Sequence, residues 1–117
     1  MKSLVINLPN VDSDAVMAGM QTAILRRIMP AGCQPGMRVI FHHNGFMVGE
    51  AVIAAAYFDT AENIATCFAG QAWMTISDAA EYLEGARRPG AILVEKPLRY
   101  EPTRPWRGMQ PLGHLYI

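Results

Sequence analysis

Apolar and polar positions alternate along several short stretches of the chain, and this alternation predicts β-strands. Residues 3–9 (SLVINLP) place apolar side chains at every second position, as a half-buried strand does. Residues 22–29 (TAILRRIM) are short and partly β-branched, and a proline follows them, so we predict a second strand. Residues 91–102 (AILVEKPLRYEP) predict a further strand, in which Pro97 indicates an edge or a bulge.

Residues 37–58 predict one long β-hairpin. The strand-like MRVIFHH is followed by Asn44-Gly45, the strongest two-residue hairpin signal, and FMVGEAVIAAAYF resumes directly after it. Gly49 inside the second arm indicates a bulge or a close backbone approach. The tail at 104–117 ends in a short apolar segment, which we expect to pair back into the sheet.

The pattern between the first two strands predicts a helix. In residues 11–20 (VDSDAVMAGM), Asp12 or Ser13 is available to cap the first free amides. Gly19 is a position at which the helix can loosen and end. We therefore expect a β-α-β start to the chain.

Two more helices are predicted in the middle of the chain. Residues 60–70 (TAENIATCFAG) form a short one, with Thr60 as its cap. Residues 75–90 (TISDAAEYLEGARRPG) have the clearest helical pattern, with Ser77 as the expected cap. Tyr82 lies in this amphipathic helix, where we expect it to join the core.

The 117 residues fit one domain, spanning 1–117. The predicted order is β-α-β, a hairpin, two helices and one or two final strands. Strands this short must cover their own apolar faces, which favours a small closed or nearly closed barrel. We therefore predict an α+β fold, a mixed β-barrel of five to six strands with two to three short helices at its side.

Composition indicates a folded protein without a membrane segment. Hydrophobic residues make up 51% and charged residues 17% of the chain, which supports a packed core. No apolar run approaches the roughly 20 residues needed to cross a bilayer, and MKSLVINLPN lacks the cleavage site of a signal peptide. Cys33 and Cys67 lie too far apart for a metal knuckle and suit a reducing compartment. We predict a cytoplasmic protein with no metal and no cofactor.

Charge is unevenly distributed although the formal net charge is zero. Residues 39–86 contain no lysine or arginine, whereas 1–38 and 87–117 are both rich in basic side chains. If the two ends meet in space, they form a positive surface. The alternative is chance segregation of charge on a solvated surface.

Several stretches together resemble ASCH domains, relatives of the PUA RNA-binding fold. The family pattern has a helix ending in Gly-x-Lys-Thr-x-Glu-x-Arg, then a hairpin with v-v-G-e-a, a segment i-S-x-e-x-x-x-Y, a strand with y-x-x-P, and a C-terminal P-P-Q-S-x-x-Y-I. The matching stretches, in the same order, are GMQTAILRR, PGMRVIFHHNGFMVGEAVI, TISDAAEYLEG, LRYEPTRPW and QPLGHLYI. The resemblance implies a PUA-like barrel with a cleft beside the first helix, and a ligand that is RNA, a nucleotide or a modified nucleoside.

The resemblance also implies a change in chemistry. Some members of the wider family are amidohydrolases acting on acylated cytidine, and they use a lysine and, three residues later, a threonine of the helix-end motif. Here Gln21 occupies the lysine position and Ile24 the later one, while Arg26 keeps the place of the family arginine. Glutamine supplies neither a cation nor a base. The resemblance therefore implies a site that retains its anion contact and lacks the reactive amine.

Basic and aromatic residues are the candidate ligand contacts. Arg26 and Arg27 alternate on a strand, so one should face the cleft and the other the solvent. A guanidinium beside a cleft can bind phosphate with two parallel hydrogen bonds, and its structural alternative is an ion pair with an acid such as Glu50. Trp106 between two arginines suits a nucleic-acid strand or a protein surface. The predicted ligand-binding set is Gln21, Arg26, Arg27, Tyr100, Arg104, Trp106 and Arg107.

Candidates for catalysis are fewer. Glu50 lies in an apolar strand and should pair with an arginine or be turned outward by the Gly49 bulge; a general base is a further alternative. Glu81 is a second weak candidate. His42 and His43 are adjacent, so on a strand they point to opposite faces and cannot easily share a metal.

Three functions stay open from the sequence. The first is RNA or nucleotide binding without a reaction, at a cleft lined by Gln21, Arg26 and Trp106 or Tyr100. The second is a small amidohydrolase using Glu50 or Glu81 on acylated cytidine nucleosides. The third is a module that binds a protein partner, such as an accessory or phage-encoded regulator built on the same scaffold.

Overall fold

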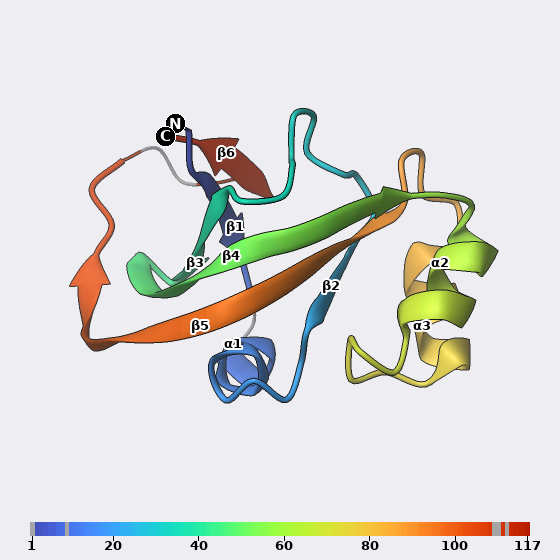
Figure 1. The fold of residues 1–117 in the computed structure, drawn as a ribbon, viewed down its shortest axis with the longest axis horizontal. Coiled ribbons are helices and arrows are strands. Elements are labelled where there is room, and N and C mark those ends of the chain that lie inside the picture. Colours follow the sequence, from blue (N-terminus) through green and yellow to red (C-terminus); the bar gives the residue numbers. More distant parts are fainter. Residues whose placement is uncertain (1, 9, 109–110, 112) are drawn as a thin grey trace.

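A computed structural model describes residues 2–8, 10–108, 111 and 113–117. Six strands and three helices are present among these residues, and the fold class is α+β, as predicted (Figure 1). In chain order the elements are β1 (Leu4–Asn7), α1 (Asn10–Met17), β2 (Ala23–Arg26), β3 (Arg38–His43), β4 (Phe46–Phe58), α2 (Ala61–Phe68), α3 (Ile76–Leu83), β5 (Gly90–Pro105) and β6 (His114–Tyr116).

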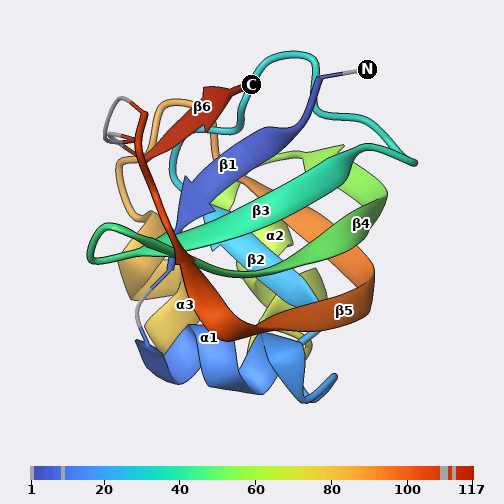
Figure 2. The same cartoon turned by 90° about the vertical axis from the view of Figure 1, so that its left-hand side faces the viewer.

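All six strands belong to one sheet with the order β2-β5-β4-β3-β1-β6. Strand β1 runs parallel to β3, and the other neighbours are antiparallel. The sheet curls strongly, so that it forms a half-barrel (Figure 2). Among the described residues no ladder joins the edge strands β2 and β6. We call the open side between these two edges the seam.

The β3–β4 hairpin forms as the sequence predicts. Asn44 and Gly45 have φ values of 48° and 83°, which the tight hairpin turn requires. Between Phe41 and His42 the register shifts, because β4 carries one extra residue next to Gly49. A Cβ on Gly49 would lie 2.5 Å from Met17 Sδ, so the close approach expected at this glycine is also present.

Strand β5 is the longest element, and its length separates its two ends. Its first residues pair with β2, and it pairs with β4 from Gly90 to Pro105. The register against β4 shifts around Pro97, where the preceding Lys96 has a φ of 53°. The predicted bulge at Pro97 is therefore confirmed.

Two predicted helix caps are wrong. Helix α1 begins at Asn10, so Asp12 and Ser13 lie inside it. Helix α3 begins one residue after Thr75, whose hydroxyl accepts a hydrogen bond from the Asp78 amide at 3.0 Å. Ser77 then falls within the first turn, where its hydroxyl no longer precedes the free amides. The predicted cap of α2 is confirmed, since Thr60 accepts from the Asn63 amide.

The apolar side chains form two clusters. One fills the half-barrel and includes Leu4, Ile24 and Phe41. The other lies between β2 and the helices α2 and α3, and includes Leu25, Ile64 and Leu83. Strand β2 therefore separates the two clusters, with alternate side chains on each side. In the described part of the chain, no helix is long and apolar enough to cross a membrane.

Candidate functional site

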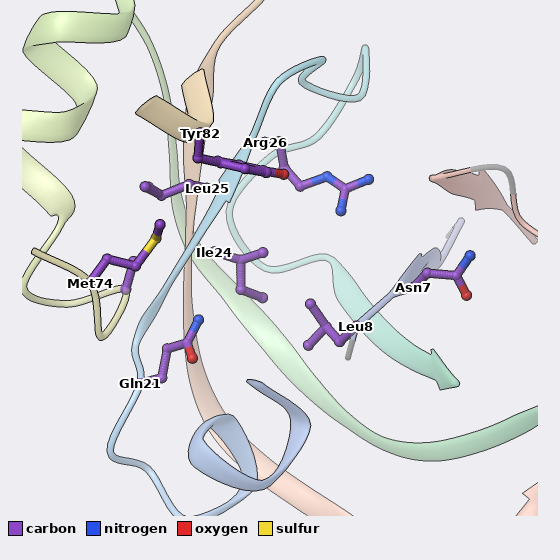
Figure 3. A pocket seen from close by; sticks show the side chains of 9 residues that line it. Asn7, Leu8, Gln21, Ile24, Leu25, Arg26, Met74 and Tyr82 are labelled. Atoms are coloured by element: carbon purple, nitrogen blue, oxygen red, sulfur yellow. The ribbon is translucent and has the colours of Figure 1, made fainter. Parts of the chain in front are cut away.

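A cavity of about 330 Å³ opens along the seam, between β1 and β2 (Figure 3). Among the described residues, β2 forms a ladder only with β5; on its other edge the Ala23 amide donates to the Gln71 carbonyl, and the rest of that edge is left facing this space. Helix α3 and the segment before it close a further side. The lining residues are Asn7, Leu8, Gln21, Ile24, Leu25, Arg26, Ala72, Met74 and Tyr82.

Arg26 supplies the positive charge of the cavity. Its backbone pairs with Gly90, and its side chain projects across the seam toward Asn7 (Figure 3). The Nε atom is buried and has no hydrogen-bond partner, and Arg26 forms no ion pair with any described residue. Burial lowers the pKa of the guanidinium, an effect that Tyr82 opposes, but arginine stays charged at neutral pH. The structure thus holds a half-buried cation without a carboxylate partner.

Gln21 supplies an unused acceptor. The side chain is 4% exposed, and its Nε2 donates to the carbonyl of Ala23 at 3.0 Å. Its Oε1 is buried and receives no hydrogen bond in the structure. Buried acceptors are normally paired, so this oxygen is suited to a donor on a bound ligand.

Asn7 ties the cavity to the neighbouring strands. Its Nδ2 donates to the carbonyl of Pro111 at 2.6 Å, which leaves Oδ1 as the acceptor toward His42 Nδ1. His42 is 2% exposed, and burial, followed by the charge of His43, lowers its pKa. The His42 ring also contacts the Trp106 ring edge-on, with 5.9 Å between centroids. Asn7 is therefore held in place from both sides.

The structure divides the predicted ligand-binding residues into separate groups. Gln21 and Arg26 line the cavity, whereas Tyr100 and Trp106 do not. The reason is the length of β5, whose far end pairs with the tip of the β3–β4 hairpin, away from β2. As expected for neighbours on a strand, Arg27 is exposed while Arg26 is half-buried.

Tyr100 and Arg104 form a pair of their own. Tyr100 is 5% exposed, its hydroxyl donates to Glu50 at 2.8 Å, and the Arg104 guanidinium lies 4.1 Å from its ring centroid. A base could stack on this ring only if Arg104 moved. Arg107 is exposed close to Trp106 in the chain.

The two candidate catalytic acids lie outside the cavity. Glu50 accepts from Tyr100 and lies 3.9 Å from Arg38, so it is paired, as one of the alternatives expected. Glu81 lines a different depression, between α2 and α3. No carboxylate, lysine or cysteine is among the nine residues that line the cavity.

Tyr82 is the main lining residue that the sequence assigned wrongly. It is 41% exposed and borders the cavity beside Arg26, whereas we expected it in the core. Helical periodicity placed it with the apolar face of α3, but that face extends past the second cluster to the seam. Tyr82 belongs to the stretch TISDAAEYLEG, which resembles the ASCH pattern, and this resemblance was the signal that could have identified it as a site residue. Leu8, Ile24 and Met74 carried no such signal, because apolar lining residues look like core residues in a sequence.

The fold matches solved structures. No protein-family model matches the sequence, and no curated protein matches it. A point variant of an ASCH protein from Zymomonas mobilis superposes with a TM-score of 0.83 at 18% identity, covering 100% of this chain and 91% of that one. The ASCH protein itself gives a TM-score of 0.82 at 17% identity, over 98% and 87% of the two chains. The chain therefore has the small PUA-like fold of ASCH proteins.

Proposed function

We propose that the protein binds RNA or a nucleotide and takes one base into the cavity along the seam. The observation that carries the proposal is that two groups without partners line the same cavity: the half-buried guanidinium of Arg26, which has no acid partner among the described residues, and the buried Gln21 Oε1, which receives no hydrogen bond. Both groups cost free energy in an empty protein, and a ligand with a negative charge and an N–H donor satisfies both.

The size and walls of the cavity agree with a base. Its volume of about 330 Å³ lies at the lower end of small-ligand sites, which start near 300 Å³. Ile24, Leu25 and Met74 provide apolar contacts, and Tyr82 adds an aromatic ring (Figure 3). Proteins that recognise unstacked RNA bases combine such walls with a few polar groups that read the base edge. Gln21 Oε1 would accept from an amino or imino group on that edge.

Binding rather than catalysis is the function that the lining chemistry supports. Amide hydrolysis needs a nucleophile or a base within reach of the substrate. The lining residues offer two carboxamides, a guanidinium and a phenol as their polar groups, with the carboxylates of Glu50 and Glu81 elsewhere. A longer RNA strand would also contact the exposed basic side chains near Trp106.

The proposal is tested by calorimetric titration with the four ribonucleosides, their monophosphates and short single-stranded RNA. We expect Gln21→Leu and Arg26→Ala each to weaken binding by about 5- to 100-fold, the value of one hydrogen bond with a buried or charged group. Oligonucleotide affinity should also fall steeply with salt.

Matched controls separate the site from general effects. Gln34→Leu changes an exposed glutamine, and Arg99→Ala removes an arginine that pairs at the surface with Asp14. Both should leave affinity nearly unchanged. The proposal is wrong if no nucleoside, nucleotide or oligonucleotide binds, or if the control variants lose as much affinity as the cavity variants. A stoichiometric protein recovered from nuclease-treated cell extract, without any nucleic-acid binding, would favour a protein-partner function instead.

A further inference from the structure

A second hollow, of about 200 Å³, lies on the other side of Arg26. It shares Arg26 and Tyr82 with the first cavity and extends along the seam toward β6. The lining residues are Arg26, Arg27, Ile28, Tyr82, Gly113 and His114. The guanidinium of Arg26 therefore stands between an apolar space and a basic one.

The second hollow is basic on two sides. Arg27 is held in place because its Nη1 donates to the carbonyls of Tyr82 and Glu84, at the C-terminal end of α3. Across the seam, His114 approaches from β6. No carboxylate lines the hollow, so nothing in its described wall neutralises Arg26. A half-buried cation in such surroundings attracts an anion.

The backbone of β6 approaches Arg26 closely. Gly113 has a φ of 98°, and a Cβ at this position would lie 3.3 Å from Arg26 Nη2. Glycine thus allows both the backbone conformation and the approach. The hollow between the guanidinium and His114 is left open for a small group.

We propose that this hollow binds the phosphate group of a nucleotide whose base lies in the first cavity. The inference rests on the proposed function and narrows its ligand to a phosphorylated nucleoside, either a free nucleotide or part of an RNA strand. Arg26 would bind phosphate oxygens with the charge-assisted hydrogen bonds that guanidinium groups form. His114 would contact the phosphate from the opposite side.

This arrangement couples binding to a proton. Burial, and then the charge of Arg26, lower the pKa of His114, so its imidazole is neutral at pH 7 in the empty hollow. A phosphate placed beside it favours the imidazolium and raises that pKa. Binding should therefore take up a proton, and affinity should increase as the pH falls from 8.0 toward 6.5. Among the described residues, the titratable and charged groups that face His114 are Arg26 from β2, Arg27 directly after β2, Tyr82 from α3 and Tyr116 from β6 itself.

The test compares each nucleoside with its 3′- and 5′-monophosphates and with dinucleoside monophosphates, by calorimetry in two buffers of different ionisation enthalpy. We expect one phosphorylated form to bind about 10- to 100-fold more tightly than its nucleoside, which is the value of one or two hydrogen bonds between charged groups. Preference for a monoester indicates a terminal phosphate, and preference for a dinucleotide indicates an internal one.

Variants and a spectroscopic measurement locate the effect. His114→Gln should abolish proton uptake and reduce the ratio of nucleotide affinity to nucleoside affinity. His43→Gln, at the other partly exposed histidine, should keep both. In the wild-type protein, the NMR titration of His114 should move to higher pH when the nucleotide is added, which needs no variant to fold.

The outcomes separate this inference from the proposed function. If nucleosides bind but a phosphate adds no affinity and leaves the His114 titration unchanged, the phosphate site is wrong and the base cavity stands. If neither nucleosides nor nucleotides bind, the proposed function and this inference both fail.

Discussion

Single side chains decide what the seam can bind. Gln21 and Arg26 were predicted as ligand contacts from a motif, and the structure places both on one cavity. Tyr100 was predicted beside them because it is aromatic. The sequence could not show that a sixteen-residue strand would carry it to the far end of the sheet. Residue type thus indicated candidate contacts, whereas strand length determined which of them meet.

At the residue scale, Gly49→Ala should lower the free energy of unfolding by about 1–3 kcal/mol, a usual cost of overpacking. The added Cβ would lie 2.5 Å from Met17 Sδ and 2.7 Å from the Leu98 carbonyl, and the carbonyl belongs to a paired strand and cannot easily shift. Urea denaturation measures the change. Gly70→Ala is the control, since a Cβ there meets no atom within 4 Å. Equal losses in the two variants would show that packing at Gly49 is not the cause.

At the element scale, α3 connects the second apolar cluster to the cavity. Its inner side buries Ala79 and Leu83, and its last turn carries Tyr82 to the cavity. The sequence predicted this helix, and in the structure Gly85, two residues after its end at Leu83, has the positive φ of a helix stop. It did not fix the first residue, because Thr75 and Ser77 are both suitable caps and only the structure shows which hydroxyl meets a free amide.

The cap of α3 is open to a paired test. Thr75→Ala should lower the free energy of unfolding by about 1 kcal/mol, because the Asp78 amide loses its hydrogen-bond acceptor. Ser77→Ala should change it by less than about 0.5 kcal/mol, as for an ordinary exposed position. Denaturant titration of both variants measures the difference. A larger loss for Ser77→Ala would contradict the cap.

At the scale of the whole molecule, the order of elements was predictable and the degree of closure was not. Alternation, turn residues and caps indicated the order of the elements, with one or two strands at the end, and the tail pairs back into the sheet, against β1. The basic ends do meet, since Ser3 and Ile117 exchange backbone hydrogen bonds and the Arg88 amide donates to the Arg27 carbonyl. Nothing in the local pattern could show that β2 and β6 do not pair with each other, because sheet closure depends on strand tilt and stagger.

Two histidines should make the free energy of unfolding depend on pH. Desolvation lowers the pKa of His42, which is buried and bound to Asn7, and of His114, which is partly buried. The unfolded chain then binds more protons than the folded one as the pH falls through the unfolded value of about 6.5. Stability should therefore be fully present above that pH and decrease below it, toward the folded pKa.

Urea denaturation at pH 7.5 and pH 5.5 checks this expectation. The decrease in the free energy of unfolding between the two pH values should be smaller in His42→Gln than in the wild type. His43→Gln should retain most of the decrease, because burial, the largest cause of the His42 shift, is unchanged. An identical decrease in His42→Gln and the wild type would contradict the assignment.

The unpaired edge of β2 also bears on how such a protein can diversify. Sheet ladders are made by backbone atoms, so side chains that line the gap can be exchanged without altering strand order. The Gln21 amide donates to the Ala15 carbonyl and β2 pairs with β5 through backbone atoms, so another side chain at position 21 would leave both contacts in place. A few replacements along this edge would therefore change which ligand groups the cavity can contact, while the strand order stays the same.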